Sequence, residues 1–161
     1  MSCRIFSLDW WDTPKLGDEA EMLAAFDVML KLNPKSLKIR SLLAQNYYDI
    51  GRYSDAEATC RKAMEEKFDI GDSYYWLAKF EIGLLFSTLA THKPTQAGKA
   101  DLYQQALKCF SERVIHEPND DLSQLKLGEM YSKLGDRDSA LKQYKILKAL
   151  HSKYADELFD L

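Results

Sequence analysis

Two segments of this chain, residues 37–70 and 121–154, align with each other without a gap. The prolines that precede them, Pro34 and Pro118, lie 84 residues apart. Because proline is tolerated in the first turn of a helix but not in its interior, each marks a joint between two helices. Segments of one chain that align with each other residue by residue are typical of proteins built from stacked repeats. The matched pairs are Leu43 and Leu127, Ala44 and Gly128, Tyr47 and Tyr131, Gly51 and Gly135, and Ala56 and Ala140.

Each segment has the pattern of two helices joined by a tight turn. Gly51 and Gly135 stand at the turns, where a left-handed backbone conformation would end the first helix. The second helix of the first segment is predicted to begin at Ser54, which forms a capping box with Glu57. In the other segment Asp138 occupies the same cap position. Strand signals are weak, because neither a hairpin turn nor a sustained alternation of apolar and polar residues occurs.

The most apolar stretch of the chain, residues 71–91, is predicted to form a long central helix that needs covering on several sides. Lys79 and Glu81 interrupt the apolar stretch, so we do not expect it to span a membrane. Residues 71–120 form a unit of 50 residues, with Ala78 aligned to the small residue Ala44. The additional residues predict a lengthened first helix and an inserted loop over residues 91–100.

These features resemble the tetratricopeptide repeat, a helix–turn–helix unit of about 34 residues. Its signature is a Leu followed by Gly or Ala, then a Tyr, a later Ala, an aromatic residue and a closing Pro. The resemblance implies an all-α fold, a right-handed superhelical stack of helix–turn–helix repeats within a single domain over residues 1–161. The expected divisions are a degenerate first repeat (1–36), three repeats (37–70, 71–120 and 121–154) and the start of a capping helix (155–161).

Composition excludes several functional classes. The formal net charge of −3 gives no general attraction to nucleic acid. The N-terminal residues have no long apolar core, so we expect neither a signal peptide nor membrane insertion. Three cysteines at irregular spacing fit a reducing, cytoplasmic environment better than a disulfide framework. Cys60 is predicted to be a packed core thiol, and Cys109 to be partly exposed.

Residue patterns for catalysis are missing from the sequence. His92, His116 and His151 are scattered, and no pair of them has the spacing that brings two ligands onto one face of a helix. The chain has no glycine-rich phosphate-binding loop. We therefore expect a protein that is not an enzyme, with no catalytic residues, no metal site and no cofactor.

The expected function is protein–protein interaction. In the family, the first helices of successive repeats line a concave groove that holds a peptide or a partner helix, and apolar side chains beside a few charges suit such a ligand. The alternative is that some of these apolar side chains belong to the core. The residues that the resemblance places in the groove are Lys38, Gln45, Tyr48, Tyr75, Lys79, Ile82, Leu122, Leu125 and Glu129.

Several functional alternatives remain open. The protein is an adaptor or scaffold, a dedicated cytosolic chaperone for a secreted or assembled protein, or a regulatory fragment of a larger complex. Phe86 and Leu89 on the central helix are candidates for contacts in a homo-oligomer. Trp10 and Trp11 belong to the degenerate first unit, where they form either a terminal cover or an exposed docking patch.

Overall fold

The computed structural model describes residues 16–68, 70–71 and 74–159. Within these residues the chain is all-helical and contains no strand, which confirms the predicted fold class. Trp10 and Trp11, and the predictions made for them, lie outside the described residues. The helices are α1 (Leu16–Leu32), α2 (Leu37–Asp49), α3 (Tyr53–Glu65), α4 (Tyr75–Thr91), α5 (Gln96–His116), α6 (Asp121–Lys133), α7 (Arg137–Ala149) and α8 (Tyr154–Phe159).

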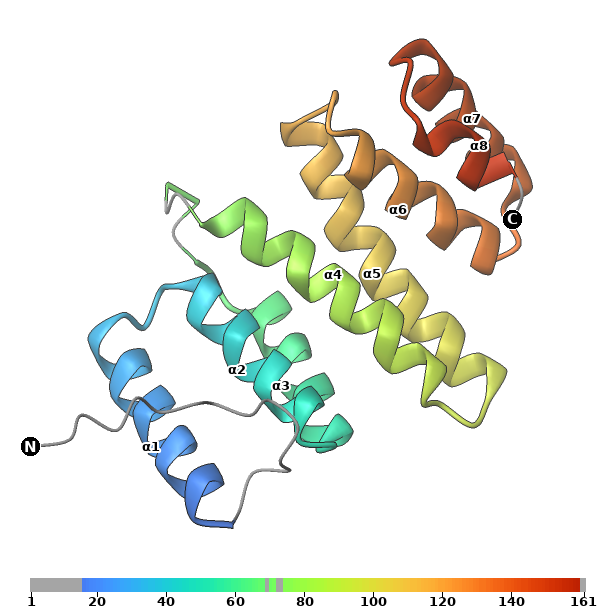
Figure 1. Ribbon diagram of the computed structural model, residues 1–161. Helices are drawn as coiled ribbons and strands as arrows, with labels where there is room; N and C mark the ends of the chain where they lie inside the picture. Colours follow the sequence, from blue (N-terminus) through green and yellow to red (C-terminus); the bar gives the residue numbers. More distant parts are fainter. Residues whose placement is uncertain (1–15, 69, 72–73, 160–161) are drawn as a thin grey trace, which may run out of the picture.

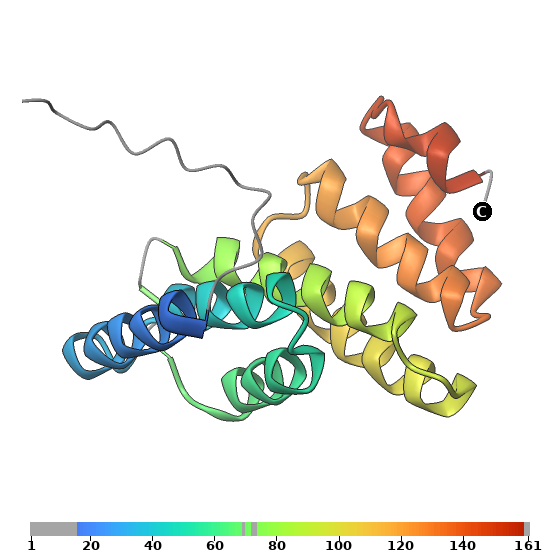
Figure 2. The same ribbon diagram turned by 60° about the horizontal axis from the view of Figure 1, so that its bottom comes forward.

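The helices pack as consecutive hairpins in a stack. Helix α2 packs against α3, α4 against α5, and α6 against α7. Neighbouring hairpins are joined by contacts of α2 and α3 with α4, and of α5 with α6. Helix α8 packs on both α6 and α7, and α1 packs on α2. As a result α1 lies at one end of the stack and α7 with α8 at the other (Figures 1 and 2).

Both turn glycines adopt the predicted conformation, but the helices that follow begin earlier than expected. Gly51 and Gly135 each have φ of 80°. Helix α3 begins at Tyr53 with no side-chain cap, so the predicted capping box at Ser54 is wrong. Helix α7 is capped by Asp136, whose carboxylate accepts a hydrogen bond from the backbone N–H of Ser139 at 3.0 Å. Only one residue separates each glycine from the next helix, because the left-handed turn already reverses the chain.

The central hairpin is lengthened in both of its helices. Helix α4 has 17 residues and α5 has 21, against 13 in each of α2, α3, α6 and α7. The loop predicted over residues 91–100 is therefore wrong, since only residues 92–95 separate α4 from α5. Thr95 caps α5 by accepting a hydrogen bond from the backbone N–H of Gly98 at 3.1 Å. This cap lets α5 begin at Gln96, two residues after Pro94, so most of the additional residues become helix.

The close approach of α4 to α5 occurs at Gly83 rather than at Ala78, the residue that the alignment placed there. A Cβ atom on Gly83 would lie 2.8 Å from Cε1 of Phe110 and 3.1 Å from Cβ of Cys109. A Cβ atom on Gly128 would likewise lie 3.2 Å from Cβ of Gln143 in α7. Cys109 follows Ala106 of α5 by three residues, just as Gln143 follows Ala140 of α7. Gly83 is therefore the equivalent of Gly128, and α4 is shifted by five residues relative to the predicted alignment.

One apolar core runs through α2 to α6, and a smaller one joins α6, α7 and α8. Cys60 and Cys109 are both fully buried in the larger core, so the prediction that Cys109 is partly exposed is wrong. The reason is that α5 packs against α4 and also touches α3 through side chains, which brings Cys109 Sγ to 3.4 Å from Met64 Sδ. Burial raises the pKa of both thiols to about 12, and therefore keeps them protonated at neutral pH.

Candidate partner-binding surfaces

The residues predicted on α2 differ in what they contact. Lys38 is half-buried and forms an ion pair with Glu81 of α4. Gln45 is exposed on the same outward side. The side chain of Tyr48 instead points to the end of the central hairpin, where its hydroxyl oxygen lies 3.3 Å from Nε2 of His92. Lys38 and Gln45 are thus accessible to a partner, whereas Tyr48 takes part in a contact between α2 and the end of the central hairpin.

The residues predicted on α4 do not lie on the outward side of that helix, so the prediction for them is wrong. Ile82 is fully buried, and Lys79 is 6% exposed with its ammonium group 2.8 Å from a carboxylate oxygen of Glu112 in α5. Tyr75 is half-buried beside Lys79 in a pocket that α2, α3 and α4 share. The physical reason is the five-residue shift at Gly83, which turns these three side chains toward α3 and α5 instead of toward solvent.

Two of the three residues predicted on α6 lie on its outward side. Leu122 and Glu129 are half-buried, and the carboxylate of Glu129 lies 2.7 Å from the ammonium group of Lys126. Leu125 is 1% exposed and packs with Leu147 and its neighbours in the smaller core, so it is not a contact for a partner. Its burial follows from α8, which covers that side of α6.

The outward sides of α2, α4 and α6 repeat one pattern, which we name the first-helix face. On each helix four residues follow at spacings of four, three and four, and none of them is buried. This spacing is present in the sequence. Matching Ala78 to Ala44 selects a different side of α4, so the alignment did not identify these residues. The residues are Lys38, Leu42, Gln45 and Asp49 on α2, Leu77, Glu81, Leu84 and Thr88 on α4, and Leu122, Lys126, Glu129 and Lys133 on α6.

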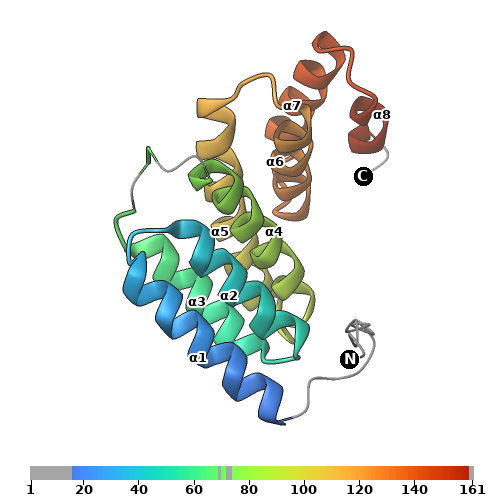
Figure 3. The ribbon, with the colours of Figure 1, turned by 60° about the vertical axis from the view of Figure 1, so that its left-hand side comes forward.

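The first-helix face combines internal ion pairs with exposed leucines. Glu81 joins two helices, because it pairs with Lys38 and also accepts a hydrogen bond from Ser41 Oγ at 2.8 Å. Leu42 is 37% exposed and Leu77 is 45% exposed on either side of this link. Helices α2 and α4 lie side by side at this point (Figure 3). Helix α6 packs against α5, α7 and α8 instead, so its part of the face is set apart.

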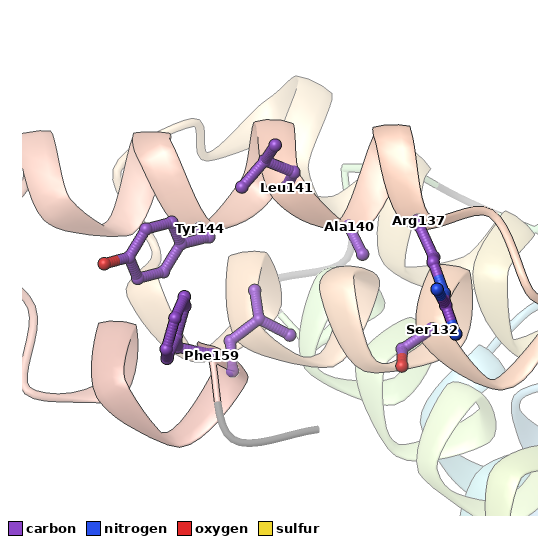
Figure 4. A pocket seen from close by; sticks show the side chains of 7 residues that line it. Ser132, Arg137, Ala140, Leu141, Tyr144 and Phe159 are labelled. Carbon is purple, nitrogen blue, oxygen red and sulfur yellow. The ribbon is translucent and has the colours of Figure 1, made fainter.

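A second candidate surface is a pocket at the α8 end of the stack, with a volume of about 380 Å³. The rings of Tyr144 and Phe159 point toward each other there, with centroids 5.3 Å apart (Figure 4). Arg137 and Ser132 lie at the other end of the pocket (Figure 4). Apolar walls beside one cationic group suit an apolar side chain that lies close to a carboxylate. The lining residues are Ser132, Arg137, Ala140, Leu141, Tyr144, Leu158 and Phe159.

The described part of the chain offers neither a membrane-spanning helix nor a metal site. None of its helices is long and apolar enough to cross a membrane. Its His, Cys, Asp and Glu side chains form no group of three or more that could hold a metal ion. Phe86 and Leu89, the candidates for homo-oligomer contacts, are buried at 0% and 2% exposure, so that prediction is wrong. The lengthened α5 covers the side of α4 on which they lie.

A known sequence family agrees with the hairpin architecture of the first part of the chain. The sequence model of the tetratricopeptide repeat matches residues 16–80. The crystal structure of MamA is similar to this chain with 18% sequence identity and a TM-score of 0.32, and the match covers 90% of this chain and 99% of MamA. No curated protein matches in sequence. Tetratricopeptide repeats generally mediate protein–protein interaction and are generally not catalytic. Residues 16–80 thus match the tetratricopeptide repeat in sequence, and the described part of the chain folds as a stack of helical hairpins.

Proposed function

We propose that this protein is a non-enzymatic adaptor or scaffold that binds a segment of a partner protein on the first-helix face. The observation that carries the proposal is the link through Glu81. It fixes α2 beside α4 and neutralises Lys38, while Leu42 and Leu77 stay exposed on either side. Exposed leucines beside satisfied charges favour a ligand that buries apolar side chains.

The chemistry of the face defines the class of ligand. Leucines at this spacing accept the apolar side of a helix, or alternate side chains of an extended segment. Gln45 and Asp49 supply polar groups at one end of the face, linked by a hydrogen bond of 2.7 Å between their side chains. The expected partner is therefore a protein segment with several apolar side chains and few charges near its centre.

The proposal is tested by capture from native lysate with the intact protein and two variants. Leu77→Glu places a charge on the face, while Ile115→Glu makes the same kind of change on α5, at a side chain that is 80% exposed. Both positions are at the surface, so both variants should fold, which circular dichroism checks. We expect a partner retained by the intact protein and by Ile115→Glu, but lost by Leu77→Glu. A partner retained by Leu77→Glu would place binding elsewhere.

The same capture separates the functional alternatives. A single protein recovered in constant ratio would favour a dedicated chaperone. Several members of one assembly recovered together would favour a scaffold or a regulatory role in a larger complex. In each case we expect Leu77→Glu to lose the captured partner, because the alternatives differ in which partner binds and not in the surface that binds it.

A further inference from the structure

The two ends of the stack carry surfaces that complement each other. At one end, α1 packs on α2 with Phe26 buried, and an adjoining side of α1 is exposed. That side carries Val28 at 55% exposure, Met29 at 39% and Leu32 at 74%. Ala25, also exposed, precedes them at helical spacing. We name Ala25, Val28, Met29 and Leu32 the α1 stripe.

Acidic residues accompany the α1 stripe. Helix α1 contains Asp18, Glu19, Glu21 and Asp27 against a single Lys31, a formal charge of −3, of which Glu19 is already paired with Arg52. Glu21 is exposed, lies one helical turn before Ala25, and forms no ion pair with any described residue. An exposed apolar stripe with a carboxylate at one end is typical of a helix that packs against an apolar surface with basic groups nearby.

The pocket at the other end has the opposite charge. Helix α7 contains Arg137, Lys142, Lys145 and Lys148 against a single Asp138, a formal charge of +3. Arg137 lines the pocket and forms no ion pair within the described part of the chain. The ammonium group of Lys148 lies 5.4 Å from the centre of the Tyr144 ring, so a second cation borders the pocket. The exposed acids of α8, Asp156 and Glu157, do not line it.

The positions of α1 and α8 in the stack show how these surfaces would meet. Helix α8 packs on α6 and α7 in the way that α4 packs on α2 and α3, so it occupies the place of a following first helix. Helix α1 precedes α2 in the place of a second helix. Among the described helices, α8 packs on α6 and α7, and α1 packs on α2. Repeat units bury their apolar sides only against such neighbours.

We infer that α1 of one copy of this chain packs into the pocket between α7 and α8 of a second copy. The α1 stripe covers Leu141, Tyr144 and Phe159, and Glu21 meets the cations of α7. The contact joins two different surfaces, so it is heterologous and leaves one free α1 and one free pocket on each dimer. Association therefore proceeds to longer chains or closed rings, and it weakens as salt screens the charges.

Sedimentation velocity over a range of concentrations tests the inference. Val28→Glu breaks the α1 stripe and Leu141→Glu breaks the pocket, and both side chains are exposed at the surface. We expect the intact protein to associate, each variant alone to lose association, and Ile115→Glu to behave as the intact protein does. A one-to-one mixture of the two variants retains one intact contact, and so forms dimers but nothing larger.

Three results would overturn the inference. They are an intact protein that stays monomeric up to millimolar concentration, either single variant associating as the intact protein does, and a mixture that stays monomeric. The partner-capture experiment depends on Leu77, which lies outside both surfaces. Failure of one proposal is therefore distinguishable from failure of the other.

Discussion

Gly83 of α4 lies directly against Phe110 of α5, so closely that a Cβ atom on the glycine would come within 2.8 Å of ring atom Cε1 and 3.0 Å of Cζ. This contact sets the rotation of α4 about its own axis. It turns Ile82 and Phe86 into the core and leaves Leu77 and Leu84 on the opposite side. The position of the first-helix face therefore depends on one residue that has no side chain.

Replacing Gly83 tests this contact. Gly83→Ala gains roughly 1 kcal/mol of helix propensity but overpacks the core against Phe110, which typically costs about 1–3 kcal/mol. We expect a net loss of roughly 1 kcal/mol in the free energy of unfolding, measured by urea denaturation. Gly98→Ala is the comparison outside the core, because the atoms nearest to a Cβ there belong to the side chains of Thr95 and Lys93, the closest at 3.1 Å. Equal stability of the two variants would contradict the close approach.

The turn between α6 and α7 depends on Gly135, whose φ of 80° lies in the left-handed region. Gly135→Ala should destabilise the protein by about 1–2 kcal/mol, because Cβ is crowded in this conformation. Nothing lies within 4 Å of a Cβ atom at this position, so the cost is one of backbone conformation alone. Gly135→Asn should cost less, since Asn tolerates this region better. Melting temperatures that rank the two variants in the reverse order would oppose this explanation.

The buried thiols make stability sensitive to alkaline pH. Burial raises the pKa of Cys60 and Cys109 from the ordinary value of 9.0 to about 12. The unfolded chain therefore loses these protons first, so the stability contribution is complete below pH 9 and declines as pH rises toward 12. We expect a smaller alkaline decline in a Cys60→Ala, Cys109→Ala double variant. An unchanged decline would assign the effect to other groups.

Thiol reactivity provides an independent check of the same burial. In a Cys3→Ser variant, a thiol reagent at pH 8 should label neither Cys60 nor Cys109 unless the protein is unfolded. Unfolding in guanidinium chloride should then release two equivalents of reactive thiol. Rapid labelling of the native variant would mean that α5 opens readily from the core.

Asp120 stabilises the start of α6. Burial alone would raise the pKa of its carboxyl group. Hydrogen bonds from Ser123 and Arg113 lower this pKa by more than burial raises it, so the pKa lies below the ordinary value of 3.8. Its stabilising contribution is thus present above that value and is lost as pH falls through the lowered pKa. Asp120→Ala should cost about 1–2 kcal/mol at neutral pH and progressively less in acid. A cost that does not change with pH would show that the charge of Asp120 is unimportant.

The repeat architecture was predictable because its signals are local. Gly51 and Gly135 have the same spacing from their small residue and their tyrosine, and each position has a steric reason that holds in any such hairpin. The start of α7 was less predictable. Asp136 and Asp138 are both good caps by residue type, and only the geometry of the turn selects Asp136.

The alignment of α4 could not be settled by local signals. Ala78 and Gly83 are both small, and both end up buried in a long apolar helix. The sequence supports both alignments, since Leu77 and Ala78 repeat the order of Leu43 and Ala44, while Ile82, Gly83 and Phe86 repeat that of Leu127, Gly128 and Tyr131. Pro94 and Gly98 are residue types that favour a loop over residues 91–100. The cap at Thr95 instead makes that region the beginning of α5.

The most direct test of the central claim is photocrosslinking from a single position on the first-helix face. A photoreactive phenylalanine analogue at Leu77 should crosslink the captured partner, because Leu77 lies at the centre of the proposed contact and is 45% exposed. The same group at Ile115, which is 80% exposed on α5, should give no crosslink. A partner crosslinked from position 115 and not from position 77 would contradict binding on the first-helix face.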